Sequence, residues 1–292
     1  MSLRIQNLSK TYSNGVKALD QLSIEIGPGM FGLLGPNGAG KSSFMRTIAT
    51  LQEPDAGEIH FQDINVLKDP MALRKVLGYL PQEFGVYPNM SAEALLDYFA
   101  LLKDIKIAAD RKKIIKEVLE VTNLWDVRKK NVSGYSGGMK QRFGIAQLLL
   151  NNPKLIIVDE PTAGLDPAER HRFLNVLREI GTNHTVIFST HIVDDVRELC
   201  NDLAIVNGGR ILFRGTPTSG ETELANRIWM RIIDRDQLED FSSRFNVLSS
   251  NYNPDNTMNI RVLSDVQPDE TFVSIKPQLE DVYFATLKND KA

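Results

Sequence analysis

Apolar and polar residues alternate over the first 26 residues of the chain, in LRIQNL and again in LSIEI. Strict alternation is typical of strands with one buried face, so an N-terminal antiparallel β subdomain is predicted, which GEIHFQDINV extends. MFGLL is instead continuously apolar and is followed by glycine, as expected of a strand buried on both faces. The helical sequence KSSFMRTIATL comes next.

A long helical region follows VLGYLPQ and runs to about Asn151. Apolar residues share one helical face in each of two segments: Leu95, Tyr98, Phe99 and Leu102 in SAEALLDYFALL, and Ile114, Ile115, Val118 and Leu119 in RKKIIKEVLEV. We expect these segments to form a helical subdomain inserted at about residues 84–151.

Strands and helices alternate after Pro153, in the order KLIIVDE, PAERHRFLNVLREI, HTVIFST, IVDDVRELC and DLAIVNGG. This alternation predicts an α/β fold with a mostly parallel sheet and helices on its faces. GTPTSGE, at residues 215–221, is rich in turn formers and is interpreted as a linker. RIWMRII, MNIRVLS and TFVSIKP are predicted strands of a small α+β appendage. The expected division is therefore 1–220 and 221–292.

Composition and charge exclude several classes of protein. Of 292 residues, 42% are hydrophobic and 24% are charged, which is typical of a globular protein. The net charge of -3 provides no positive field for nucleic acid, so no nucleic-acid partner is expected. No apolar run approaches the ~18 residues that span a bilayer, and we expect a cytoplasmic protein. The single cysteine, Cys200, shares a helical stripe with Val196 and Leu199 and is interpreted as a core residue.

The segment GPNGAGKS fits the pattern G-x-x-x-x-G-K-[ST] and lies between a predicted strand and a predicted helix. Backbone N–H groups of such a turn form a concavity for phosphate oxygens, and the helix N-terminus adds partial positive charge. Lys41 would reach the β- and γ-phosphates, and the Ser42 hydroxyl would ligate Mg²⁺. The candidate ATP-binding residues here are Gly35, Pro36, Asn37, Gly38, Ala39, Gly40, Lys41, Ser42 and Ser43. The alternative is a glycine-rich turn without a ligand.

Two carboxylates end the apolar strand LIIVDE. A doubly wound sheet places the carboxyl ends of its strands beside the GPNGAGKS turn, which is called the phosphate loop below. Asp159 is therefore a candidate Mg²⁺ partner through water, and Glu160 a candidate base for the attacking water. An acidic pair after a strand also commonly begins a loop or caps a helix, and the phosphate loop upstream favours the catalytic interpretation. The phosphate loop alone leaves GTPases, kinases and many ATPases open, and the acidic pair narrows the choice.

YSGGMKQRFGIAQLLL stands between these motifs, and AGLDP and FSTH follow them. In this order the motifs resemble the nucleotide-binding subunit of ATP-binding-cassette (ABC) transporters over about residues 1–220, which implies a P-loop NTPase fold. The resemblance implies that Ser136, Gly137 and Gly138 contact the γ-phosphate of ATP held by another copy in a head-to-tail dimer, and that Asp166 crosses the interface. Asp166 also precedes Pro167, with Glu169 three residues on, an arrangement that equally favours a helix N-cap. Ser136 would also cap the helix that begins at Gly137.

Further roles follow from the same resemblance. Gln82 matches the glutamine loop that contacts Mg²⁺ and the water, His191 matches the switch histidine that bonds the γ-phosphate, and Tyr12 matches the aromatic residue that stacks on adenine. The family commonly has LSGGQ, whereas this chain has Tyr135 and Met139 at the first and last positions, and methionine cannot supply glutamine's hydrogen bonds. The other histidines, His60, His171 and His184, are interpreted as structural or exposed.

The function implied by the resemblance is ATP hydrolysis coupled to transport. Two subunits, identical or homologous, would close around two MgATP and drive a substrate through a separate transmembrane permease, with the subunit peripheral on the inner face of the cell membrane. The tail QLEDVYFATL resembles the ending of cassettes that serve drug, antibiotic, lipid and polysaccharide exporters. The alternatives are a soluble ABC-type ATPase of DNA repair or translation, which would carry a coiled-coil insertion or tandem cassettes, and a nucleotide kinase, which does not need Glu160, Ser136 and His191 together.

Overall fold

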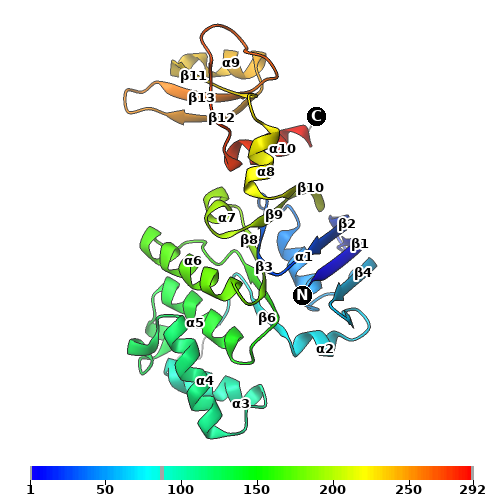
Figure 1. The fold of residues 1–292 in the computed structure, drawn as a ribbon, viewed down its shortest axis with the longest axis vertical. Helices are drawn as coiled ribbons and strands as arrows, with labels where there is room; N and C mark the ends of the chain where they lie inside the picture. Colours follow the sequence, from blue (N-terminus) through cyan, green and yellow to red (C-terminus); the bar gives the residue numbers. More distant parts are fainter. Residues whose placement is uncertain (1, 86–88, 291–292) are drawn as a thin grey trace.

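A computed structural model describes residues 2–85 and 89–290, and its central element is a sheet with the strand order β10-β9-β3-β8-β7-β6 (Figure 1). The strands are β3 (Gly29–Leu34), β6 (Leu77–Leu80), β7 (Leu155–Asp159), β8 (Thr185–Thr190), β9 (Asp202–Asn207) and β10 (Arg210–Gly215). Neighbours from β9 to β6 pair parallel, and β10 pairs antiparallel with β9. The predicted mostly parallel sheet is confirmed.

Both faces of the central sheet are covered, which is why its strands are continuously apolar. Met30, Ile156 and Phe188 face one hydrophobic core with α6 (Pro167–Gly181) and α7 (Val193–Leu199). The neighbouring residues Phe31 and Ile157 face the other core, which contains α1 (Lys41–Ile48). The period of two in a strand thus sends successive side chains into opposite cores.

An antiparallel sheet, β2-β1-β4-β5, covers the α1 side of the molecule and confirms the predicted N-terminal β subdomain. Its strands are β1 (Leu3–Thr11), β2 (Lys17–Ile26), β4 (Ala56–Phe61) and β5 (Ile64–Asn65), and the short helix α2 (Pro70–Arg74) follows them. Leu3 and Ile5 are buried in the same core as α1, as the alternating pattern requires, and a register shift between Ile5 and Leu8 brings Leu8 into that core too.

The helical region contains α3 (Ala92–Leu102), α4 (Ala108–Val121), α5 (Gly137–Leu149) and the 3₁₀ turns η1 (Trp125–Val127) and η2 (Val132–Gly134). Residues 86–88 of the expected 84–151 block lie outside the described residues. The prediction of which face of α3 is buried is wrong in part, because Tyr98 and Leu102 are 43% and 66% exposed. The helix instead buries Ala92, Leu96 and Ala100 beside Leu95, since small alanines let it approach its neighbours closely.

The C-terminal region forms an antiparallel sheet, β12-β13-β11-β14, with α9 packed on it, and lies at the opposite end of the molecule from α3 (Figure 1). Its elements are α8 (Pro217–Glu223), β11 (Ile228–Ile233), the turn η3 (Arg235–Gln237), α9 (Leu238–Arg244), β12 (Val247–Tyr252), β13 (Met258–Leu263), β14 (Val273–Ser274) and α10 (Leu279–Asn289). The α+β character is confirmed, and the exact division at 220/221 stays a prediction.

The prediction of a linker at residues 215–221 is wrong, because most of this segment forms the helix α8. Thr216 caps this helix by accepting a hydrogen bond from the backbone N–H of Ser219, and Pro217 occupies the first turn. The last helix, α10, lies against α8 and α7, and its Leu279 and Val282 join the core that contains Val196. None of the helices within residues 2–85 and 89–290 combines the length and apolarity needed to cross a bilayer.

Candidate active site

The phosphate loop connects β3 to α1, as the sequence predicts. Gly38 and Gly40 have φ angles of 81° and 102°, which L side chains rarely adopt. A Cβ added to Gly40 would lie 2.4 Å from the carbonyl oxygen of Ala18, and one added to Gly35 would lie 2.3 Å from that of Val206. The tight approach of these chain segments therefore excludes side chains and leaves backbone N–H groups at the N-terminus of α1, which fits a phosphate.

Lys41 is buried at the base of this loop, with 4% of its side chain exposed. Its Nζ donates to the carbonyl oxygens of Gly35 at 2.7 Å and Pro36 at 3.1 Å, and lies 3.1 Å from Oε1 of Glu160. An ammonium group has three N–H donors, and these contacts use all of them. A phosphate that reaches Lys41 must therefore displace one of these partners, and Glu160 is the one on a side chain.

Asp159 and Glu160 follow directly at the carboxyl end of β7, where a hydroxyl group links them. Ser189 Oγ donates to Oδ1 of the buried Asp159 at 2.6 Å and accepts from the backbone N–H of Glu160 at 3.0 Å. Glu160 has a φ angle of +43°, an uncommon conformation for a residue other than glycine. This conformation turns its side chain back toward the phosphate loop and His191, whose Nδ1 is 3.3 Å from Glu160 Oε2.

A cavity of about 460 Å³ opens beside the phosphate loop. It brings together several of the predicted residues, Tyr12, Asn37, Gly38, Ala39, Gly40, Lys41, Ser42, Ser43, Gln82 and Glu160. The Tyr12 hydroxyl is 2.9 Å from Ser43 Oγ and donates to Gln52 Oε1 at 3.0 Å, which holds the ring at the cavity wall. The lining of the cavity thus includes an aromatic ring, the glycine-rich loop and a carboxylate.

Oxygen donors suited to Mg²⁺ line this cavity or lie beside it. Ser42 and Gln82 line the cavity, and the buried carboxylate of Asp159 stands at the end of the strand that carries Glu160. Mg²⁺ typically keeps several waters and binds through one or two protein oxygens plus substrate phosphates, so this donor set fits it. Across the described residues, no group of three or more His, Cys, Asp or Glu side chains could hold a metal ion by itself.

The segment from Tyr135 to Met139, which matches the family's LSGGQ, does not line this cavity. Ser136 is exposed and caps α5, accepting a hydrogen bond from the backbone N–H of Met139 at 3.2 Å, as predicted. Gly137 is exposed too, whereas a Cβ at the buried Gly138 would lie 2.2 Å from a carboxylate oxygen of Glu169. The N-terminus of this 13-residue helix is therefore an outward-facing cluster of backbone N–H groups.

The two unusual residues of this segment have structural contacts. The buried Tyr135 donates its hydroxyl to the carbonyl of Val127 at 2.9 Å, and burial raises the pKa of Tyr135 to about 12. Met139 is partly buried against the core of the helical region. Both side chains thus anchor the helix end instead of extending toward a ligand.

Asp166 is exposed and caps α6, accepting from the backbone N–H of Glu169 at 2.9 Å, as predicted. The remaining histidines fit the interpretation given above: His184 Nδ1 lies 2.7 Å from the Ile180 carbonyl, and His171 is 70% exposed. Ser189, inside FSTH, received no role from the sequence. Its position at the carboxyl end of an apolar strand, two residues before His191, was the available signal.

Comparison with known proteins gives a consistent result. The family model described as ABC transporter matches residues 19–163. The chain is 36% identical over 214 residues to an uncharacterized ABC transporter ATP-binding protein, YxlF of Bacillus subtilis, covering 73% of this chain and 70% of the relative. It is 38% identical over 222 residues to the Nod factor export ATP-binding protein I of Rhizobium etli, covering 74% and 68%.

The structure is similar to that of cbiO1 from Clostridium perfringens, described as part of the ABC transporter complex cbiONQ. The TM-score is 0.70 at 29% identity, over 76% of this chain and 90% of the other. These relatives carry the names of transporter subunits, which favours that interpretation over an ATPase of DNA repair or translation and over a nucleotide kinase.

Proposed function

This chain belongs to the ABC transporter family as an ATP-binding subunit and is an ATPase, and on that premise we propose which of its residues bind and hydrolyse ATP. One observation carries the proposal. The Glu160 carboxylate lies between the ammonium group of Lys41 and the imidazole of His191, at the end of the phosphate-loop cavity. A base, a phosphate-binding cation and a second polar group thus meet where a γ-phosphate would end.

In the proposed binding mode, ATP lies along the cavity. The adenine ring stacks on Tyr12, and the phosphates lie against the backbone N–H groups of residues 35–43, with Lys41 on the β- and γ-phosphates. Ser42, Gln82 and Asp159 are the residues that would hold Mg²⁺. When bound, Mg²⁺ supplies positive charge that offsets the negative charge of the phosphate oxygens.

Hydrolysis uses Glu160 and His191. The carboxylate of Glu160 accepts a proton from a water molecule, whose oxygen forms a bond to the γ-phosphorus while the bond to the bridging oxygen of ADP breaks. His191 donates a hydrogen bond to the γ-phosphate and fixes the water between itself and Glu160. Inorganic phosphate and ADP leave, with the electron pair of the broken bond on ADP.

Each site is completed by a second subunit. Ser136, Gly137 and Gly138 bind the γ-phosphate held by the other copy, and Asp166 crosses the interface. The exposed N-terminus of α5 and the absence of these residues from the wall of the described cavity support this proposal. An identical or a homologous partner would satisfy the same geometry.

The membrane-spanning function belongs to a separate permease, to which this subunit attaches on the inner face of the cell membrane, and transport is directed outward. Two relatives support these statements: cbiO1 is part of a multi-subunit transporter complex, and the Rhizobium etli protein is named for export. The transported substrate is recognised by the permease.

The shared site is tested by the mass of a slow-turnover variant. Glu160→Gln with MgATP should elute as a dimer by size-exclusion chromatography with light scattering, at twice the 32.8 kDa of the chain. Ser136→Arg in the same background should bind ATP and stay monomeric, because the arginine side chain blocks the N-terminus of α5. Equal dimer fractions for the two proteins would refute the proposed interface.

A further inference from the structure

Asp195, in the first turn of α7, is a carboxylate with no exposed surface, and it lies outside the nucleotide cavity. Its Oδ2 accepts from Thr162 Oγ1 at 2.6 Å and, more weakly, from Thr190 Oγ1 at 3.4 Å. Its Oδ1 accepts from Nε of Arg170 at 2.5 Å. One buried carboxylate therefore joins the segment that follows β7, the end of β8 and the first turn of α6.

Two of these segments carry the proposed catalytic residues. Thr162 follows Glu160 by two residues and is itself 3% exposed. Thr190 ends β8 directly before His191, and its Oγ1 accepts from the backbone N–H of Ile192 at 2.9 Å, which shapes the turn at the histidine. A shift of Asp195 would thus displace both the segment that carries Glu160 and the turn that carries His191.

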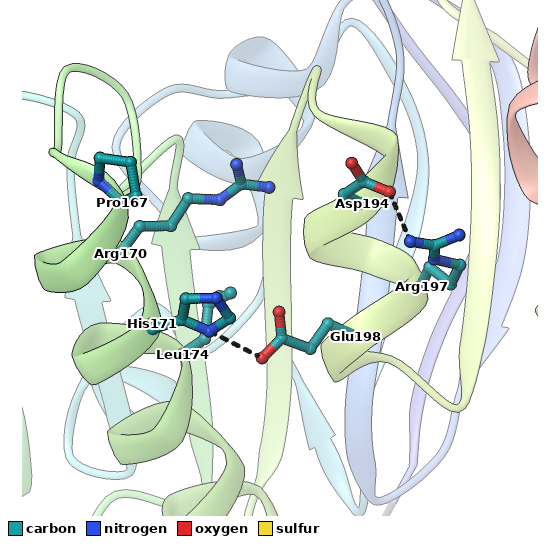
Figure 2. A pocket seen from close by; sticks show the side chains of 7 residues that line it. All are labelled: Pro167, Arg170, His171, Leu174, Asp194, Arg197 and Glu198. Atoms are coloured by element: carbon teal, nitrogen blue, oxygen red, sulfur yellow. Dashed lines mark ion pairs between the residues drawn. The ribbon is translucent and has the colours of Figure 1, made fainter.

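The third segment is the first turn of α6, the helix that Asp166 caps. Arg170 extends from α6 toward α7 beside a cavity of about 420 Å³, which Glu198 borders on the α7 side (Figure 2). The arginine is 29% exposed, whereas its partner Asp195 is fully buried. The ion pair thus fixes α7 to the start of α6 at the edge of this cavity.

Stability alone does not explain a charge at this place. Removal of a carboxylate from water is costly, and apolar residues of similar size stabilise a core as well as a buried ion pair or better. A carboxylate does what an apolar side chain cannot, because it fixes the direction of each donor that it accepts from. Misplacement by about 1 Å can cost an enzyme 10²-fold in rate, so such fixation matters at a catalytic site.

We propose that Asp195 is a positioning residue for ATP hydrolysis. Through Thr162 and Thr190 it holds the Glu160 segment and the His191 turn in one relative position, and through Arg170 it ties both to the start of α6. The inference rests on the proposed function, because it requires Glu160 and His191 to act on the same phosphate.

The hydroxyl of Thr162 offers the sharpest test. Thr162→Val keeps the shape of the side chain and loses the hydrogen bond, whereas Thr162→Ser keeps the hydrogen bond and loses a methyl group. Positioning predicts that the valine variant of the full chain, assayed well below its melting temperature, loses about tenfold or more in kcat with KM near wild type. The serine variant should keep a kcat within about threefold of wild type.

A role in packing alone predicts the opposite order, since valine preserves the contacts of the methyl group. A wild-type kcat for Thr162→Val overturns the inference. So does a loss that is equal in both variants or that follows the melting temperature. Asp195→Asn gives an independent reading: it should lower kcat at least as much as Thr162→Val, and normal turnover contradicts the proposal.

Two reference variants separate this inference from its premise. If Glu160→Gln and His191→Ala both keep wild-type turnover, the proposed catalytic roles fail whatever Thr162 does. If they lose turnover, the double variant Glu160→Gln/Thr162→Val should be no more than about twofold slower than Glu160→Gln alone, because the base that Thr162 positions is already absent. A further loss of tenfold in that background would show that Thr162 does not act through Glu160.

Discussion

Replacement of Glu160 by glutamine separates two effects of its carboxylate. The side chain is 11% exposed, and its oxygens lie 3.1 Å from Lys41 Nζ and 3.3 Å from His191 Nδ1. Glutamine keeps the shape but loses the charge. It cannot accept a proton from water, and it holds the ammonium group of Lys41 less strongly.

The substitution should lower kcat and raise the affinity for ATP. Loss of a general base lowers kcat by about 10²- to 10⁴-fold. Nucleotide binding should improve, because Lys41 must exchange Glu160 for phosphate oxygens when ATP enters. Hydrogen bonds to charged groups contribute about 1.5–3 kcal/mol, and part of this is recovered in the new contact, so we expect about tenfold tighter binding, or about 1.4 kcal/mol.

Phosphate release at saturating MgATP measures the first effect, and titration with ATP in the absence of Mg²⁺ measures the second without turnover. His191→Ala is the matched control, because it should slow turnover while leaving the Lys41–Glu160 pair in place, so that affinity does not increase. A glutamine variant with wild-type kcat would remove Glu160 as the base. Unchanged or weaker ATP binding would show that the Lys41 contact does not compete with the nucleotide.

Three further outcomes are expected from single residues. Lys41→Ala should weaken ATP binding by about 10- to 100-fold in calorimetry, since a charged hydrogen bond to phosphate is lost, and unchanged affinity would contradict the phosphate-loop assignment. Tyr12→Ala should weaken binding by about 1–3 kcal/mol through lost stacking, whereas Tyr12→Phe keeps the ring and should stay close to wild type; equal losses would refute stacking. Burial raises the pKa of the Cys200 thiol, so N-ethylmaleimide at pH 8 should modify it only after unfolding, and rapid labelling of the native protein would contradict its place in the core.

The geometry of the proposed phosphate site was predictable because neighbouring residues determine it. Gly38 and Gly40 adopt the positive φ angles for which glycine is suited, and the loop stands at the strand-to-helix junction that its mechanism requires. Asp159 and Glu160 end a strand whose continuous apolar run already places it inside the sheet. Each of these features depends on fewer than about ten consecutive residues, which is the range over which periodicity and turn signals operate.

The contacts around Ser189 and Asp195 could not be predicted in the same way. Ser189 is 30 residues from Asp159, and Asp195 is 33 residues from Thr162, so their pairing depends on the order of strands in the sheet. An aspartate in the first turn of a helix usually indicates a favourable interaction with the helix dipole at the surface. Nothing in VDDVREL distinguishes the buried Asp195 from the exposed Asp194 before it.

The error at α8 has a different origin. GTPTSGE is rich in residues that favour turns, but it also contains a helix start, because Thr216 is a suitable N-cap and Pro217 suits the first turn. The helix is stabilised by tertiary contacts with α10, and the buried Gly220 gives α10 room to approach, since a Cβ there would lie 2.9 Å from Val282. The prediction followed composition instead of the capping signal because α10, the helix on which α8 packs, is some 60 residues away in the sequence.

The most direct test of the shared site is a crystal structure of Glu160→Gln with MgATP. Two subunits should be arranged head to tail, with Ser136 of each within hydrogen-bonding distance of the γ-phosphate that Lys41 of the other holds. A structure in which each nucleotide is enclosed by one chain, with Ser136 remote from every phosphate, would contradict the account.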